Sequence, residues 1–147
     1  MSNSNSIPIL TKCKRRNKTV ETLSMIDCGA GGQFIDHNYA KAMGFAIQQL
    51  EHPLKALNVD GTENKSGRIK SFVNLEVTLD DKIMDVRFLV TGLGKQKILL
   101  GLPWLKEHNP NINWKTGEFA WRIPRRMIKI KRYHDLPRPL ALAKNLA

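Results

Sequence analysis

The residue best placed to do chemistry in this chain is Asp27, which ends an apolar run and begins a glycine-rich turn. It follows Met25 and Ile26 and precedes the run Cys-Gly-Ala-Gly-Gly. A carboxylate at the end of a buried strand, on a turn that glycines make irregular, is placed to face a cleft and to act as a general acid or base. The structural alternative is an Asx turn, in which the carboxylate accepts hydrogen bonds from nearby backbone amides.

Two other chemistries find little support in the residue pattern. Cys28 could be a catalytic nucleophile with His37 or His108 as its general base, but the spacing of these residues does not match that of a catalytic triad. The four histidines are dispersed and no Cys/His pair has the spacing of metal ligands, so we predict no metal site. We expect the histidines to lie at the surface.

Length and composition exclude several classes of protein. The 147 residues are 41% hydrophobic and 25% charged, which is typical of one globular domain and not of a disordered chain. The longest apolar run, Ile98–Leu105, contains Gly and Pro and is too short to span a membrane. The first residues lack the features of a signal peptide, and two cysteines do not make a disulfide scaffold. We therefore expect an intracellular, cytoplasmic protein.

The formal net charge of +11 is concentrated near the two ends of the sequence. Residues 1–18 carry five Lys/Arg and no acid, and residues 122–147 carry eight Lys/Arg and one acid. Residues 19–121 are nearly neutral, with eleven Lys/Arg and twelve acids. The charge thus indicates appendages, and we expect the function in the neutral middle. The segment 122–147 is predicted to be a solvated linker; the alternative is that it grips RNA through phosphates.

Alternating apolar and polar residues predict a chain that is mostly β between residues 7 and 121. A hairpin is expected with a turn at Lys14–Lys18, and a wide polar loop at Asn58–Gly67. The wholly apolar run Ile98-Leu99-Leu100-Gly101 predicts a short strand buried on both faces. The predicted strands are 7–13, 19–26, 69–79, 84–90 and 98–101, followed by a small hairpin over 112–121.

Capping signals predict two short helices. Asp36 is suited to the start of the first, and Gly44 to its end in a left-handed conformation. The second covers Leu102–His108, with Pro103 at its first position. We expect three tryptophans to anchor the core because a small β domain needs large buried side chains: Trp104, Trp114 and Trp121.

Taken in order, these motifs resemble a known family of enzymes. Met25–Asp36 is similar to the active-site segment of retropepsin-like aspartic proteases, which reads apolar-apolar-Asp-Ser/Thr-Gly-Ala. The polar loop follows where these enzymes have their flap, and Ile98–Gly101 resembles the Ile-Leu-Gly strand beneath their active site. Leu102–Trp114 resembles the protease segment of gypsy-class LTR retrotransposon polyproteins, particularly fungal ones.

The resemblance implies an all-β, closed retropepsin-like fold with one or two short helices, forming half of a pseudo-pepsin dimer. It implies residues 7–121 as the protease domain, residues 1–6 as a disordered start and 122–147 as a basic linker. It implies no cofactor, because carboxylates activate the attacking water. The roles it implies are catalysis for Asp27, the active-site turn for Cys28, Gly29 and Ala30, the flap for Asp60, Gly61 and Thr62, and support for Ile98, Leu99, Leu100 and Gly101.

Hydrolysis by this route needs two carboxylates around one water, and the chain offers one. Asp60-Gly61-Thr62 has the wrong order for a second motif, and Asp36 lies at a helix start. The resemblance therefore implies a homodimer that joins two copies of Asp27 and cleaves its own polyprotein, in the cytoplasm or in virus-like particles. Cys28 replaces the family's Ser or Thr, and Gly31 stands where Thr or Ser is common. The alternative is an inactive dimerisation or peptide-binding module whose basic tails contact nucleic acid.

Overall fold

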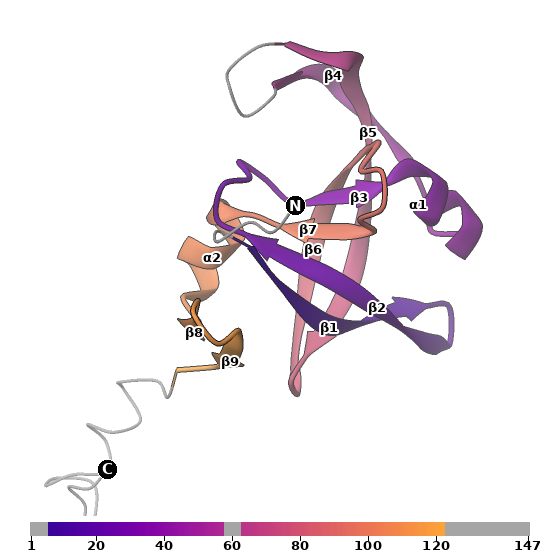
Figure 1. The fold of residues 1–147 in the computed structure, drawn as a ribbon. Coiled ribbons are helices and arrows are strands. Elements are labelled where there is room, and N and C mark those ends of the chain that lie inside the picture. The colour runs from indigo at the N-terminus through magenta and orange to yellow at the C-terminus, as the bar shows by residue number, and fades with distance from the viewer. Residues whose placement is uncertain (1–5, 58–62, 123–147) are drawn as a thin grey trace, which may run out of the picture.

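The main sheet closes into a barrel because its first strand pairs with two others (Figure 1). The structure, a computed structural model, describes residues 6–57 and 63–122. The sheet order is β1-β2-β7-β3-β6-β5-β4, and β1 also pairs with β5. The elements are β1 (Ser6–Arg15), β2 (Lys18–Asp27), β3 (Phe34–Asp36), α1 (His37–Met43), β4 (Gln48–Leu57), β5 (Glu63–Leu79), β6 (Lys82–Thr91), β7 (Ile98–Leu100), α2 (Leu102–His108), β8 (Asn111–Asn113) and β9 (Glu118–Ala120).

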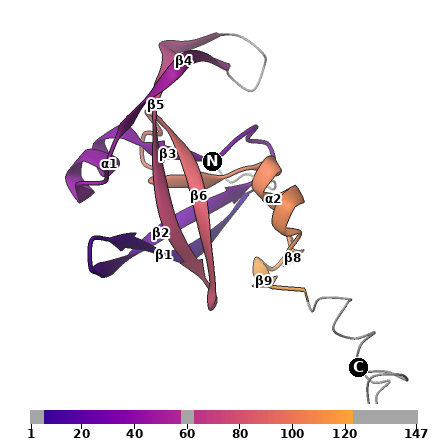
Figure 2. The same ribbon diagram turned by 180° about the vertical axis from the view of Figure 1, so that it is seen from behind.

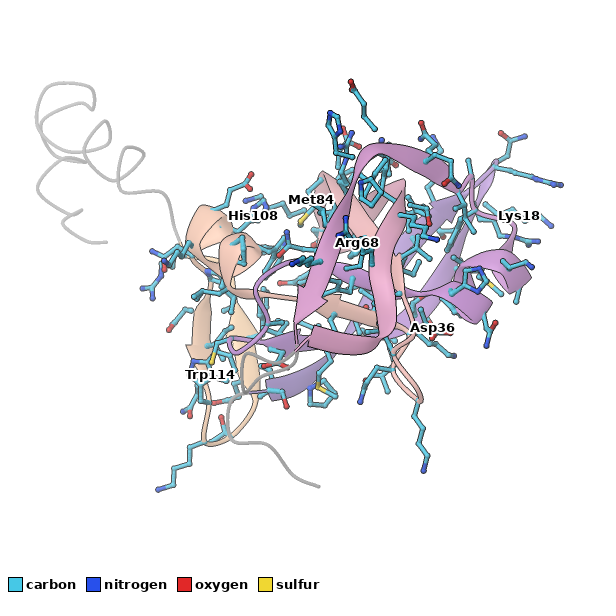
Figure 3. The ribbon with its side chains drawn as sticks, turned by 90° about the horizontal axis from the view of Figure 1, so that it is seen from above. Lys18, Asp36, Arg68, Met84, His108 and Trp114 are labelled. Atoms are coloured by element: carbon cyan, nitrogen blue, oxygen red, sulfur yellow. The ribbon has the colours of Figure 1, made fainter. Side chains whose placement is uncertain are left out.

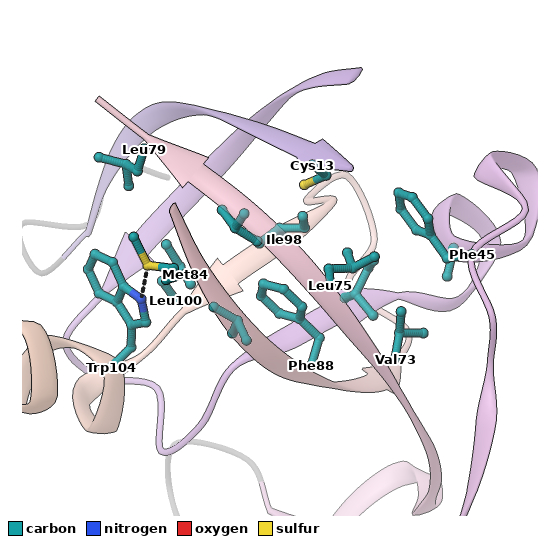
Figure 4. Close-up of a cluster of buried hydrophobic side chains, with 14 of the residues drawn as sticks. Cys13, Phe45, Val73, Leu75, Leu79, Met84, Phe88, Ile98, Leu100 and Trp104 are labelled. Carbon is teal, nitrogen blue, oxygen red and sulfur yellow. Dashed lines mark hydrogen bonds between the residues drawn. The ribbon is translucent and has the colours of Figure 1, made fainter. Parts of the chain in front are cut away.

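Strands β5 and β6 confirm the alternation predicted from the sequence. They pair antiparallel from Phe72–Leu89 to Leu79–Lys82, and their inward residues supply much of the core. The core also receives β7 and Trp104 of α2, whose Nε1 lies 3.4 Å from Sδ of Met84 (Figure 4). The buried residues of the two strands are Ile69, Phe72, Val73, Leu75, Val77, Leu79, Met84, Val86, Phe88 and Val90.

The predicted hairpin is confirmed and extends further than expected. β1 and β2 pair along their whole length, from Ser6–Asp27 to Arg15–Lys18. Ser6, which was expected in the disordered start, is the first residue of β1. The basic cluster at residues 12–18 covers the ends of these two barrel strands and the turn between them, in agreement with the predicted turn at Lys14–Lys18.

Strand β7 lies in the barrel wall between β2, to which it runs parallel, and β3, to which it runs antiparallel. Ile98 and Leu100 are buried, but Leu99 is only partly buried. The prediction of a strand buried on both faces is therefore wrong for Leu99, which points to the other face of the sheet because side chains alternate.

Both predicted helices are confirmed. Asp36 caps α1 and accepts a hydrogen bond from the Tyr39 amide, and Gly44 ends the helix at φ 73°. α2 covers the predicted residues with Pro103 in its first turn, and Asn109 ends it in a left-handed conformation. Neither helix in the described part of the chain has the length and apolar character needed to cross a bilayer.

The segment between α1 and β5 differs from the expectation. β4 is a strand that the sequence analysis does not predict, and it forms the outer edge of the sheet beside β5 (Figure 2). β5 already begins at Glu63, so residues 63–67 belong to a strand and not to the predicted wide loop. Residues 58–62, including the predicted flap residues Asp60, Gly61 and Thr62, lie outside the described residues.

The aromatic residues near the end of the barrel correct two predictions. Trp104 is buried and Trp121 is partly buried, but the Trp114 side chain is 38% exposed, so it does not anchor the core. His108 was expected at the surface, yet its ring packs against Trp104 and Trp121 at centroid distances of 5.0 and 6.1 Å. His37 and His52 are exposed, as predicted. The predicted fold class, a closed, mostly β structure with two short helices, is confirmed.

Candidate active site

The turn that follows β2 holds the Asp27 carboxylate in a defined position. The Gly29 amide donates a hydrogen bond to Oδ1 of Asp27 at 2.8 Å, and the Ala30 amide donates to the Asp27 carbonyl at 3.1 Å. This geometry is the Asx turn that the sequence offers as the structural alternative. Asp27 is partly exposed, and no described residue donates a hydrogen bond to its Oδ2. One carboxylate oxygen of Asp27 is thus held in place by the backbone of the turn.

Gly101 supports this turn from below, where it follows β7. The Leu102 amide donates to the Ala30 carbonyl at 2.8 Å. A Cβ atom on Gly101 would lie 2.2 Å from the carbonyl oxygen of Gly32 and 2.6 Å from that of Ala30. Only glycine fits in this contact, so the turn and the residue after β7 form one tightly packed unit.

Gln33 is a positioning residue that the sequence analysis misses. Its Oε1 accepts hydrogen bonds from the amides of Gly101 and Trp104, at 3.3 and 3.2 Å. Gly101 is the N-cap of α2 and has no side chain to satisfy the first amides of that helix. Gln33 supplies the missing acceptor and ties the Asp27 turn to α2. The only signal in the sequence is a side-chain amide directly after the glycines.

Both carboxylate oxygens of Asp36 accept hydrogen bonds from backbone amides. Its Oδ2 accepts from the Tyr39 amide at 3.1 Å, and its Oδ1 accepts from the Leu93 amide at 2.9 Å. Its side chain is nearly buried beside α1 (Figure 3). Because both oxygens are occupied by backbone donors, Asp36 is not a second carboxylate for the Asp27 site.

Cys28 lies at an open cavity and is not part of the barrel core. It lines an open cavity of about 380 Å³ together with residues of α2 and the segment around β8. The exposed apolar side chains of Leu102 and Trp114 also line this cavity, as do the cationic side chains of Lys106 and Arg122. No described residue forms a hydrogen bond with the Cys28 thiol. The cavity therefore places an apolar surface directly beside the Asp27 turn.

Two titratable groups with shifted pKa values, Cys13 and His108, do not join this site. Cys13 is buried in the barrel, and burial raises the pKa of its thiol, partly offset by hydrogen bonds with Thr22 and Thr11. Burial lowers the pKa of His108, which lies beside Glu107 and Lys82. Within the described ranges, no group of three or more Asp, Glu, His or Cys residues is arranged to hold a metal ion.

Comparison with known proteins identifies the architecture around this turn. Residues 23–125 match the family described as PEG10/RTL1 protease domain. The retroviral protease-like domain of Ddi1 from Leishmania major has a similar structure, with a TM-score of 0.50 and 16% identity over 86% of this chain and 97% of that chain. A retropepsin-like aspartic protease from Rickettsia conorii gives a TM-score of 0.46 and 20% identity, over 74% of this chain and 86% of that chain.

The family match covers the Asp27 turn, the core strands β5 and β6, the strand β7 with Gly101, and both helices. It includes the second half of β2, which carries Asp27, and begins after β1. The likeness to the Leishmania major domain agrees with it at the level of the fold. The chain belongs to the PEG10/RTL1 protease domain family, which is retropepsin-like.

Proposed function

We propose that the chain is an aspartic endopeptidase that acts as a homodimer, with Asp27 of each copy as the catalytic residue. The observation that carries this proposal is the Asp27 turn. One carboxylate oxygen is held by the Gly29 amide at 2.8 Å, the other accepts no hydrogen bond from the described residues, and Gly101 packs beneath. Family membership supports proteolysis as the activity.

The proposed mechanism uses two carboxylates and one water. When two Asp27 side chains face each other at about 3 Å, both cannot easily ionise, so the pair shares one proton. The ionised carboxylate takes a proton from the water, which attacks the carbonyl carbon of the peptide bond, while the protonated one donates to the carbonyl oxygen. The two titrations then belong to the pair and not to either residue.

A second copy is required because the described part of one chain offers no partner for Asp27. Asp36 is occupied by two backbone amides, Asp80 and Asp81 form the turn between β5 and β6, and Asp85 lies within β6 opposite Glu76. A symmetric dimer brings the same residue from both copies to its twofold axis. The cavity beside Cys28, with Trp114 and Leu102 exposed, offers apolar surface on the same side as the turn.

The further roles predicted from the sequence are part of the same proposal. The segment with Asp60, Gly61 and Thr62 would close over the substrate and exclude water. The substrate would be the polyprotein of a gypsy-class, fungal-type retrotransposon in the cytoplasm, with 7–121 as the protease domain and 122–147 as a linker.

The second candidate function is a dimerisation or peptide-binding module that does not hydrolyse its ligand. Cys28 is the observation in its favour. A thiol is a weaker hydrogen-bond donor than the Ser or Thr hydroxyl of the related enzymes. A hydrogen bond made by residue 28 between two copies would therefore be weaker. In this alternative the basic residues 122–147 contact nucleic acid.

The test compares the chain with Asp27→Asn and with Asp81→Asn, which removes a carboxylate from an exposed turn. Cleavage of an unstructured polypeptide at mildly acidic pH should be lost in Asp27→Asn and kept in Asp81→Asn. Light scattering should find a dimer, and a pepstatin-type inhibitor should bind it. Cleavage by Asp27→Asn, or a chain that stays monomeric at every attainable concentration, would overturn the proposal. Peptide binding without cleavage by the unchanged protein would favour the second function.

A further inference from the structure

The turn of the β1–β2 hairpin carries a cluster of positive charge that the proposed protease does not use. We call this cluster the basic tip. All of its members are exposed, and the first 18 residues contain no acid. The basic tip consists of Lys14, Arg15, Arg16 and Lys18 of the hairpin and Lys41 of α1.

The basic tip belongs to the folded barrel and is not a loose appendage. Arg15 and Lys18 are the last register pair of the β1–β2 ladder. Arg15 Nε donates to the carbonyl oxygen of Met43 at 2.5 Å, which joins the hairpin to the end of α1, the helix that carries Lys41. The fold therefore presents these cations together on a rigid support, so a ligand would not have to order a flexible segment.

No carboxylate neutralises the basic tip within the described residues. The ion pairs found among them are His52–Glu51 and His108–Glu107, and neither includes a lysine or an arginine. Arg16 also occupies a left-handed conformation at φ 58°, where glycine or asparagine is less strained. Packing does not require a long cation at this exposed position.

The basic tip lies far from the Asp27 turn. Asp27 and Lys18 are the two ends of β2, a strand of 10 residues. At roughly 3.3 Å per residue, the strand separates them by about 30 Å. The hairpin turn lies on the side of α1, opposite α2, in both views of the ribbon (Figures 1 and 2). Lys18 likewise lies opposite His108 and Trp114 (Figure 3). A ligand on the basic tip would therefore leave the candidate active site open.

We propose that the basic tip is a sequence-independent binding site for the phosphate backbone of nucleic acid. Asn17, between Arg16 and Lys18, is polar, and so is Thr19 beside them. The exposed leucines of this hairpin, Leu10 and Leu23, form a register pair four to five residues from the nearest cation of the tip. Ammonium and guanidinium groups bind phosphates by charge, whereas reading bases in a single strand needs stacking side chains. A membrane surface would gain from apolar side chains that insert beside the charges, whereas the exposed Leu10–Leu23 pair lies partway along the hairpin and not at its charged turn.

The experiment measures binding of the full chain to labelled single-stranded RNA, and to DNA of the same sequence, by fluorescence anisotropy over a series of salt concentrations. The tip variant is Lys14→Gln/Arg16→Gln/Lys18→Gln, which leaves the Arg15 contact intact. The control variant, Lys55→Gln/Lys70→Gln/Lys95→Gln, removes the same charge from exposed positions elsewhere. All three proteins keep residues 122–147, so the contribution of that segment is the same. Circular dichroism checks that each variant is folded.

We expect the tip variant to bind at least tenfold more weakly, with a slope of log K against log salt that is smaller by about 2, because three contacts to a single strand each contribute roughly 0.7. The control variant should keep the slope of the unchanged protein. Equal affinity for RNA and DNA would show that the tip binds the phosphate backbone that both share. A higher affinity for one of them would identify that nucleic acid as the preferred ligand. Equal losses in the two variants, or no binding by the unchanged chain at low salt, would overturn the proposal. Tip-dependent binding only to vesicles of phosphatidylcholine and phosphatidylserine would replace nucleic acid with a membrane.

Discussion

Gly101 and Gly32 are in backbone contact: a methyl group on Gly101 would lie 2.2 Å from the carbonyl oxygen of Gly32. The two glycines are almost seventy residues apart in the sequence. Their contact, together with the hydrogen bond from the Leu102 amide to the Ala30 carbonyl, sets how closely the Asp27 turn packs against the segment after β7. A contact between backbones leaves no side chain that could move aside. The position of the candidate catalytic carboxylate therefore depends on the absence of a side chain at Gly101, the residue between β7 and α2.

Gly101→Ala should destabilise the fold by about 1–3 kcal/mol or more, because the added Cβ has no room. The backbone of Gly101, at φ −98°, suits any residue, so the cost is steric alone. Gly92→Ala is the matched control, since a Cβ there meets no atom within 4 Å. Urea unfolding of both variants measures the difference. Equal stability of the two would contradict the contact.

The tryptophans at positions 104 and 114 should respond very differently to truncation. Trp104 is 2% exposed and packs in the core against Met84, so Trp104→Ala should cost about 3–5 kcal/mol. Trp114 is 38% exposed and lies outside the buried core cluster, so Trp114→Ala should cost clearly less, about 1–2 kcal/mol. Thermal unfolding of both variants checks the prediction. Equal losses in the two variants would contradict the difference in burial.

The two thiols should differ in reactivity. Cys13 is fully buried and burial raises the pKa of its thiol, so little thiolate forms and reagents cannot reach it. Cys28 is partly exposed and lines an open cavity. At neutral pH a disulfide reagent should titrate one thiol in the native chain and two in denaturant. Cys28→Ser should abolish the native reaction; a native reaction that survives this change would place Cys13 within reach of solvent.

Acidification should weaken the fold through His108. Burial lowers the pKa of His108 in the folded state, so the unfolded chain binds the proton more readily. The contribution is fully present above the unfolded pKa of about 6.5 and is lost as the pH falls through the lower folded value. His108→Gln should flatten this part of the stability profile, whereas the exposed His37→Gln should not. Urea unfolding between neutral and mildly acidic pH measures both slopes, and equal slopes in the two variants would refute the assignment.

Cys28→Ser should increase proteolysis if the proposed dimer holds. The hydroxyl is a better donor than the thiol and makes a shorter bond across the twofold axis. The rate of polypeptide cleavage at fixed dimer concentration is the measurement, so that a change in dimerisation is not mistaken for a change in catalysis. An unchanged rate would show that position 28 does not limit the activity.

Several strands and both helices could be predicted because short local sequence patterns determine them. The alternation in 69–79 and 84–90 marks two half-buried strands, and the Asp36 and Gly44 caps mark α1. β4 escaped prediction because Gln48–Leu57 contains Pro53 and no regular alternation, and its pairing with β5 is interrupted by register shifts. Non-local pairing, which a single segment does not encode, makes it a strand.

The sequence indicated the candidate residues and Gly101 as their support, but not the hydrogen bonds that Gln33 and Asp36 make. The Asp27 turn is visible as a motif, and the Asx turn and the proposed catalytic role turn out to be compatible interpretations of one geometry. The role of Gln33 depends on the amides of Gly101 and Trp104, and that of Asp36 on the amide of Leu93. These partners lie 57 to 71 residues away in sequence, so only the folded chain reveals them.

The insertion of β7 between β2 and β3 has a consequence for how the barrel assembles. Strands β2 and β3 do not pair with each other; each pairs with β7 (residues 98–100), which lies between them. The barrel therefore cannot form until β7 has been synthesised. Closure also needs β1 to meet β5 across more than sixty residues. Contacts of such long range slow folding, so a nascent chain that stops before Ile98 would present an unsealed sheet to chaperones or to neighbouring chains.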